Sequence, residues 1–201
     1  MLFSTSYFGT IPYFQELVKQ STILIDAHEN YQKQTWRNRT AILSADGTFL
    51  ISVPVERPYG KNTKIKDVVI SNATNWQKDH WKAIESCYKH APFFYYYEER
   101  IHELIYQKEQ NLLAFNSQIL KQLLDWLDFE IIFEFSEQEF PYCGKDDIRI
   151  LLNQKVLSFP QEKYIQVFSD VQPFTPNLSI LDLLLNEGPM ARNYLTERSR
   201  E

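Results

Sequence analysis

The stretch LFSTSYFGTIPYFQELVKQSTILID, residues 2–26, decides the fold class. Residues 2–7 and 21–26 are rich in apolar and β-branched side chains, a pattern typical of buried strands. Pro12 suits the first turn of a helix, which we expect over residues 13–19. Two strands joined by a helix favour a parallel pair, because parallel strands need a long crossover connection. The opening of the chain therefore predicts an α/β protein.

The next part of the chain predicts antiparallel strands. Residues 40–43 and 49–55 carry strand-like apolar runs, and Asp46-Gly47 between them is a strong hairpin signal. Residues 67–70 predict one more strand. We expect these strands to join the parallel pair in one mixed sheet.

Helical spacing dominates after residue 74. Thr74 and Gln77 fit a capping box for a helix that we expect to end near His90, before Pro92. Further helices are expected over residues 93–106, 111–127, 145–153 and from Ser179 to Gly188-Pro189, with a strand over 130–135 and a short strand or turn over 164–168. We therefore predict a single α/β domain over residues 1–195: a mixed sheet with a β-α-β start, an antiparallel middle and a helical second half, followed by a charged tail over 196–201.

Composition excludes several classes of protein. Net charge is −5 with a pI near 5.5, which argues against nucleic-acid binding, since that needs a basic face. The loop RPYGKNTKIK, residues 57–66, is a local exception that is either simply solvated or steers anions. No apolar run approaches the roughly 20 residues of a membrane span. The two cysteines, Cys87 and Cys143, form no framework, so we expect a reduced, cytoplasmic location.

Familiar catalytic and cofactor motifs are missing from the sequence. It holds no glycine-rich dinucleotide or phosphate loop, no nucleophile elbow and no paired histidines of a zinc protease. We therefore expect neither nicotinamide nor flavin chemistry and no metal site, and the residues identify no other cofactor.

The richest polar segment is HENYQKQTWRNR, residues 28–39, directly after the apolar run 22–25. Ligand sites of α/β proteins lie in such loops at strand ends. His28 is a candidate general base, or else a hydrogen-bonded surface histidine. Arg37 and Arg39 would form a fork for a carboxylate or phosphate, or else salt bridges that hold the loop. Lys33 and Gln34 favour the anion site. The candidate substrate-binding residues of this loop are Glu29, Tyr31, Lys33, Gln34, Arg37, Asn38 and Arg39.

A second histidine, His80, shares one helical stripe with Trp76, Ile84 and Tyr88. Burial among such neighbours would keep the imidazole neutral. His80 is therefore either a core histidine or a second candidate base that opens onto the pocket.

The segment PNLSILDLLLNEG, residues 176–188, places polar residues in an otherwise apolar helix. Asn177 could cap the helix, Asp182 could pair with its first turn and Asn186 could end it. Asp182 and Asn186 lie four positions apart and share a face, so all three residues are also candidates to line a cleft.

These stretches together resemble the WbqC-like family. They are residues 2–14, the polar loop 28–39, Asn75-Trp76 with His80-Trp81 and Ile84-Glu85-Ser86, Tyr88, Pro92-Phe93, and 176–188. The resemblance implies a bacterial protein linked to surface-polysaccharide biosynthesis, and aminoacyl transfer has been suggested for a member. Many members have Gln-Pro after the first strand, where this chain has Thr5-Ser6. Chemistry that depends on that pair would differ here.

The resemblance and the residues together predict a cytoplasmic transferase that moves an aminoacyl or acyl group to a sugar or related small metabolite. His28 would be the base, with His80 as the alternative, while Arg37 and Arg39 would hold an anionic substrate group. Asn38, Gln34 and Tyr31 would orient hydroxyls, and Asp182 and Asn186 would close the pocket. The alternative is a non-catalytic module that binds the same small molecule or a partner protein. The sequence does not indicate an oligomeric state.

Overall fold

The structure is a computed structural model that describes residues 1–142, 147–152 and 161–197. Its central element is a parallel sheet in the order β1-β2-β7, formed by β1 (Leu2–Phe3), β2 (Thr22–Ile25) and β7 (Ile132–Phe135). Phe3 pairs with Ile25, and Ile25 pairs with Phe135, so the three strands end at one edge.

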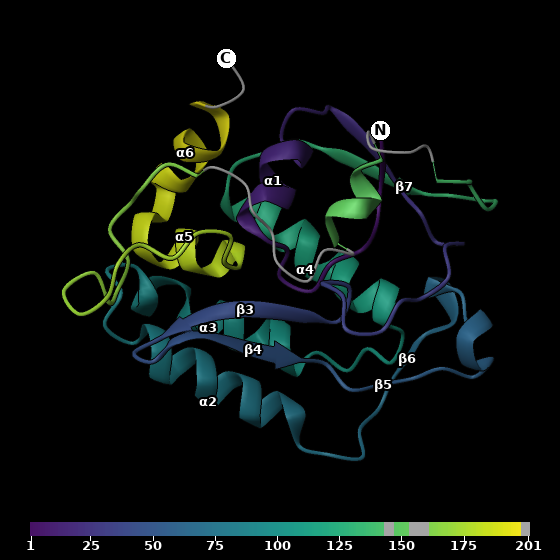
Figure 1. The fold of residues 1–201 in the computed structure, drawn as a ribbon, viewed down its shortest axis with the longest axis horizontal. Helices are drawn as coiled ribbons and strands as arrows, with labels where there is room; N and C mark the ends of the chain where they lie inside the picture. The colour runs from purple at the N-terminus through teal and green to yellow at the C-terminus, as the bar shows by residue number, and fades with distance from the viewer. Residues whose placement is uncertain (143–146, 153–160, 198–201) are drawn as a thin grey trace.

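The crossover from β1 to β2 is the helix α1 (Ile11–Leu17), beside the sheet in Figure 1. The Thr10 hydroxyl accepts a hydrogen bond from the Tyr13 amide, and Pro12 occupies the first turn. Both are local N-terminal signals. The predicted β-α-β opening is confirmed.

The middle of the chain is antiparallel. Strands β3 (Arg39–Ser44) and β4 (Gly47–Ser52) form the predicted hairpin, and β5 (Val55–Glu56) pairs with β6 (Val69–Ile70). Within the described part of the chain, these pairs form two small sheets of their own instead of joining the parallel sheet. β3 packs against the helices α2 (Trp76–Tyr88) and α5 (Ile180–Glu187).

The second half is largely helical, as predicted. Its helices are α2 (Trp76–Tyr88), α3 (Phe94–Tyr106), α4 (Leu112–Trp126), α5 (Ile180–Glu187) and α6 (Ala191–Glu197). Short 3-10 turns complete the fold: η1 (Gly60–Asn62), η2 (Ile65–Asp67), η4 (Ile148–Leu152) and η5 (Gly188–Met190). The α/β class is therefore confirmed. α6 was not predicted, because Gly188-Pro189 ends α5 but also begins a turn that leads into a new helix.

Several local predictions were wrong. The first strand stops at Phe3 rather than residue 7, because the chain turns and the Tyr7 amide donates to the Trp36 carbonyl instead. The capping box is not formed: Asn75 is the N-cap of α2, and Gln77 Nε2 donates to the distant Ile105 carbonyl at 2.9 Å.

Other local predictions were met only in part. Residues 145, 146 and 153 of the predicted helix 145–153 lie outside the described residues, and the described part is the 3-10 turn η4. Residues 164–168 form no strand and lead into a turn. The expected tail begins inside α6, and residues 198–201 lie outside the described part.

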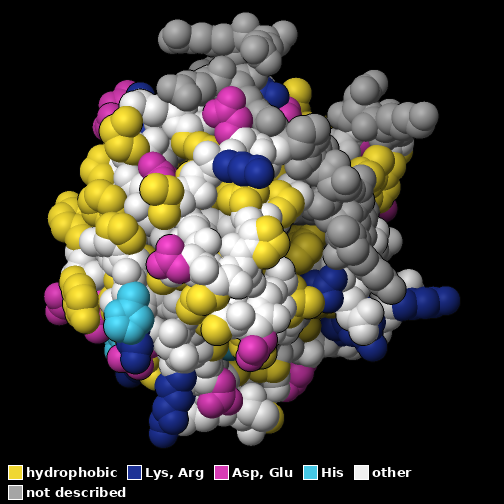
Figure 2. Space-filling view, turned by 60° about the vertical axis from the view of Figure 1, so that its left-hand side comes forward, with side chains coloured by type: hydrophobic (Ala, Val, Ile, Leu, Met, Phe, Trp, Pro, Cys, Tyr) yellow, Lys and Arg dark blue, Asp and Glu magenta, His cyan; other side chains and the backbone are white. Residues whose placement is uncertain are grey.

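The surface on the side of α5 and α6 mixes residue types. Figure 2 shows hydrophobic side chains there in separate groups, interspersed with acidic and basic ones. No helix in the described ranges is long and apolar enough to cross a membrane.

Candidate functional site

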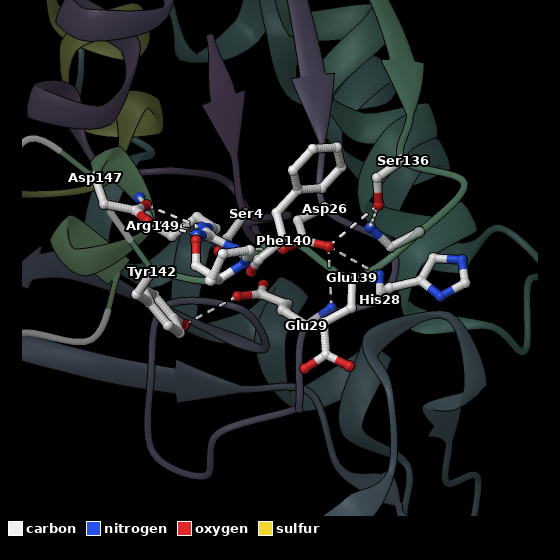
Figure 3. Close-up of polar contacts among 12 residues, drawn as sticks. Ser4, Asp26, His28, Glu29, Ser136, Glu139, Phe140, Tyr142, Asp147 and Arg149 are labelled. Carbon is white, nitrogen blue, oxygen red and sulfur yellow. Dashed lines mark hydrogen bonds and ion pairs between the residues drawn. The ribbon is translucent and has the colours of Figure 1, made fainter. Parts of the chain in front are cut away.

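Polar residues gather where the three parallel strands end. Ser4, Asp26 and Ser136 directly follow β1, β2 and β7. Asp26 Oδ1 accepts hydrogen bonds from Ser136 Oγ at 3.1 Å and from the amides of His28 and Glu29, each at 3.0 Å (Figure 3). These bonds fold the loop after β2 into a tight turn over the buried Asp26 carboxylate.

Glu29 and Arg37 form a buried, two-point ion pair. Arg37 Nε donates to Glu29 Oε1 at 2.8 Å, and Nη2 donates to Oε2 at 2.6 Å. Nη2 also donates to Ser4 Oγ at 2.9 Å. The exposed fractions of Glu29 and Arg37 are 3% and 0%. Burial lowers the pKa of Arg37, but the hydrogen bond and charge of Glu29 outweigh it and raise this pKa above its ordinary value. The arrangement is the loop-holding salt bridge that we considered as the alternative to an anion fork.

A second buried guanidinium, Arg149 on η4, closes the other side of the cluster. Its Nη1 donates to Asp26 Oδ2 at 2.5 Å and to the Phe140 carbonyl at 3.0 Å, and its Nε donates to Asp147 Oδ1 at 2.9 Å. The guanidinium carbon lies 4.3 Å from the centre of the Tyr142 ring. Arg149 therefore ties the loop after β7 to the end of β2. We call Ser4, Asp26, Glu29, Arg37, Ser136, Asp147 and Arg149 the strand-end network.

His28 sits on this network but its side chain is not part of it. Its main chain is held by Asp26, while the imidazole is partly exposed and points away from the buried carboxylates (Figure 3). His28 Nε2 lies 3.4 Å from Lys66 Nζ.

The basic loop 57–66 runs beside His28. The Tyr31 amide donates to the Thr63 carbonyl at 2.9 Å, the Ile65 amide to the Glu29 carbonyl at 3.0 Å, and the Lys66 amide to the Ala27 carbonyl at 3.1 Å. These bonds hold the lysines of the loop at the same edge as His28.

The other predicted residues of the polar loop take separate positions. Asn38 Nδ2 donates to the Val53 carbonyl at 2.7 Å, and Arg39 stacks over Trp36 at 5.2 Å from the ring centre. Arg39 is partly exposed, whereas Arg37 is fully buried, so the two guanidiniums do not present one fork. The remaining members are the buried Tyr31 and the exposed Lys33 and Gln34.

His80 is a core residue. Its Nδ1 lies 2.9 Å from the Tyr7 hydroxyl, and its ring packs against Trp76. Burial lowers the pKa of His80 to about 4, although a backbone hydrogen bond with Ser52 and the charge of Asp79 act in the opposite direction. The structure therefore places His80 as the core interpretation predicts.

The C-terminal candidates form a separate buried cluster. Asp182 accepts from the hydroxyls of Tyr88, at 3.0 Å, and Tyr164, and from Gln166 Nε2 at 3.0 Å. Burial raises the pKa of Asp182, and these hydrogen bonds only partly oppose it. We call Tyr88, Tyr164, Gln166 and Asp182 the Asp182 cluster.

Asn186 lies beside that cluster, whereas the Asn177 amide donates to Gln161 Oε1 at 2.7 Å. Asn186 Nδ2 donates to the Asp182 carbonyl at 2.7 Å. Ser179, not Asn177, caps α5: its hydroxyl accepts from the Leu181 amide at 3.2 Å. Asn177 precedes the cap with a left-handed backbone, φ 64°.

The sequence model of the WbqC-like protein family matches residues 5–157. The chain belongs to this family. It is also 28% identical over 212 residues to an uncharacterized protein of Mycobacterium tuberculosis, Rv1507c, and the match covers 91% of each chain. No solved structure matches significantly.

The family match spans most of the strand-end network of this WbqC-like protein, from Asp26 to Arg149, while α5 and α6 lie beyond it. Sequence reasoning identified Glu29 and Arg37 but missed Ser4, Asp26, Ser136, Asp147 and Arg149. Asp26 and Ser136 could have been found, because each falls at or directly after the end of a predicted strand. Arg149 carries no such local signal.

Over the ranges that the structure describes, no three His, Cys, Asp or Glu side chains are grouped so that they could hold an ion. The carboxylates of Asp26 and Glu29 are instead satisfied by guanidiniums, hydroxyls and amides.

Proposed function

We propose that this WbqC-like protein is a group-transfer enzyme that acts on a small anionic metabolite, with His28 as its general base. The observation that carries the proposal is the contrast between the main chain and the side chain of His28. Its main chain is pinned by the buried Asp26, while its imidazole remains accessible beside Lys66. A rigid support under an accessible base is what catalysis by a positioned side chain needs.

The contact with Lys66 determines which nitrogen can act as the base. A lysine ammonium only donates hydrogen bonds, so His28 Nε2 is the acceptor in this contact. Nε2 is therefore the nitrogen that we assign as the base. A substrate anion that draws Lys66 away would free the lone pair of Nε2 for proton transfer.

The proposed reaction is acyl or aminoacyl transfer. A hydroxyl or amine of the acceptor attacks the carbonyl carbon of the donor, and its proton passes to His28 Nε2. The new bond forms as the bond to the leaving group breaks, and the leaving group takes the proton from Nε2. The resemblance to a family linked to surface polysaccharides supports a sugar or a related metabolite as the acceptor.

A ligand screen followed by a turnover assay tests this proposal. Full-length protein is heated with ATP, coenzyme A, free glycine and several nucleotide-sugars, since a ligand at about 100 times its Kd stabilises by about 2.7 kcal/mol. Ligands that bind are then assayed for transfer. We expect His28→Gln to lower kcat by roughly 10²–10⁴-fold, with the ligand-induced change in Tm retained.

The matched control is His90→Gln, which changes an exposed histidine at the end of α2. It should leave kcat unchanged. Ligand binding without turnover for every donor and acceptor would overturn the enzyme proposal and favour a binding module. Equal activity of His28→Gln and wild type would exclude His28 as the base.

A further inference from the structure

Two lysines of the basic loop have a fixed position beside His28. Lys64 forms a β-bridge with Asn30, and Ile65 next to it is fully buried. Lys66 Nζ lies 3.4 Å from His28 Nε2. Because backbone bonds from both sides anchor this part of the loop, the main chain of both lysines is held at the edge that carries His28.

A carboxylate of the chain itself meets these lysines. Lys64 Nζ donates to Glu139 Oε2 at 2.7 Å, although the two residues are 75 positions apart. Lys64 lowers the pKa of Glu139 through its hydrogen bond and its charge. Figure 3 shows Glu139 next to His28. A carboxylate oxygen therefore already pairs with Lys64 beside His28.

The strand-end network fixes the segment that carries Glu139. Ser136 on one side bonds to Asp26, and the carbonyls of Phe140 and Pro141 on the other accept from Arg149. Glu139 itself is exposed, and exposed ion pairs are weak. A soluble anion can therefore compete with this carboxylate.

We propose that Lys64, Lys66 and His28 form a subsite for a phosphoryl group of the substrate, and that the Glu139 carboxylate fills this subsite until substrate displaces it. Lysine ammonium groups bind phosphate as point charges. A phosphate dianion gains more Coulomb energy from two ammonium groups than a single carboxylate does. That the phosphoryl group belongs to a substrate rests on the function proposed above, whereas anion binding at this subsite does not depend on that function.

The test is a titration of the full chain with inorganic phosphate at constant ionic strength. The proton NMR signals of the imidazole rings are recorded at each phosphate concentration. The chain has four histidines, and His28→Gln assigns the signal of His28. We expect this signal to shift saturably with phosphate, while the signal of the buried His80 stays in place. Lys64→Gln should weaken phosphate binding about tenfold or more, because a charge-assisted hydrogen bond is lost. Glu139→Gln should strengthen it severalfold, because the competing carboxylate is gone.

The matched control is Lys19→Gln, which removes an exposed lysine that also pairs with a glutamate at 2.7 Å, here Glu16 on α1. Its phosphate affinity should equal that of wild type. An unshifted His28 signal, equal losses for Lys19→Gln and Lys64→Gln, or unchanged affinity in Glu139→Gln would overturn the inference. Acetate binding as tight as phosphate would overturn the assignment to a phosphoryl group. If phosphate binds as expected but the transfer assay shows no turnover, the subsite is upheld and the proposed function is rejected.

Discussion

The strand-end network and the Asp182 cluster both bury carboxylates, but they satisfy them in different ways. Asp26 and Glu29 pair with the guanidiniums of Arg149 and Arg37. Asp182, with an exposed fraction of 0%, receives hydrogen bonds from neutral hydroxyls and an amide. Where no positive charge compensates, burial dominates and raises the pKa of the carboxyl.

The two regions also differ in which segments they connect and where they lie. Opposite charges hold segments from distant parts of the chain at the end of the parallel sheet, directly beneath the accessible His28. The neutral donors of the Asp182 cluster attach residues 164–166 to α5 and α2 inside the core. The first region lies beneath the site that we propose at His28, and the second lies within the core.

The largest expected effect tests the charge pairing. Arg37→Met leaves the buried Glu29 carboxylate uncompensated, which should cost about 3–5 kcal/mol in the free energy of unfolding. Urea denaturation measures this loss. The double variant Glu29→Met/Arg37→Met should recover most of it, because apolar residues can replace a buried ion pair. A loss below about 1 kcal/mol for Arg37→Met would show that the pair does not hold the loop.

The next effect concerns pH and His80. Its folded pKa of about 4 lies below its unfolded value of 6.5, so its contribution is fully present above pH 6.5 and is lost as pH falls towards 4. Over this window wild type should lose about 3 kcal/mol more stability than His80→Gln. Denaturation curves at several pH values measure the difference. The exposed-site variant His90→Gln should follow wild type, and parallel curves for wild type and His80→Gln would refute a buried neutral His80.

The smallest expected effect tests the Asp182 cluster. Asp182→Asn keeps the shape and removes the charge, so it should change stability at neutral pH by only about 1 kcal/mol. Because the pKa of Asp182 is raised above 3.8, its stabilising contribution is present below pH 3.8 and is lost as pH rises through the folded pKa. The stability of wild type relative to the variant should therefore fall as pH rises from about 4. A loss as large as that of Arg37→Met would show that the Asp182 charge itself is needed.

Local signals were reliable where local contacts decide the structure. Pro12 lies in the first turn of α1, and Asp46-Gly47 turns the hairpin, as these residue types do in most contexts. The capping box at Thr74 was wrong because Gln77 finds a partner 28 positions away, which no nearby residue announces.

The same distinction between local and long-range contacts applies to the candidate site. The sequence by itself determined the β-α-β opening, the hairpin, the helical second half and the position of a polar loop after β2, because each depends on neighbouring residues. Only the tertiary structure decided which charged groups of that loop are buried. Asp26 meets Arg149 across 123 positions, and Lys64 meets Glu139 across 75. Such pairs depend on strands that align side by side and bring distant segments to one edge, so Arg37 is buried there while His28 remains accessible.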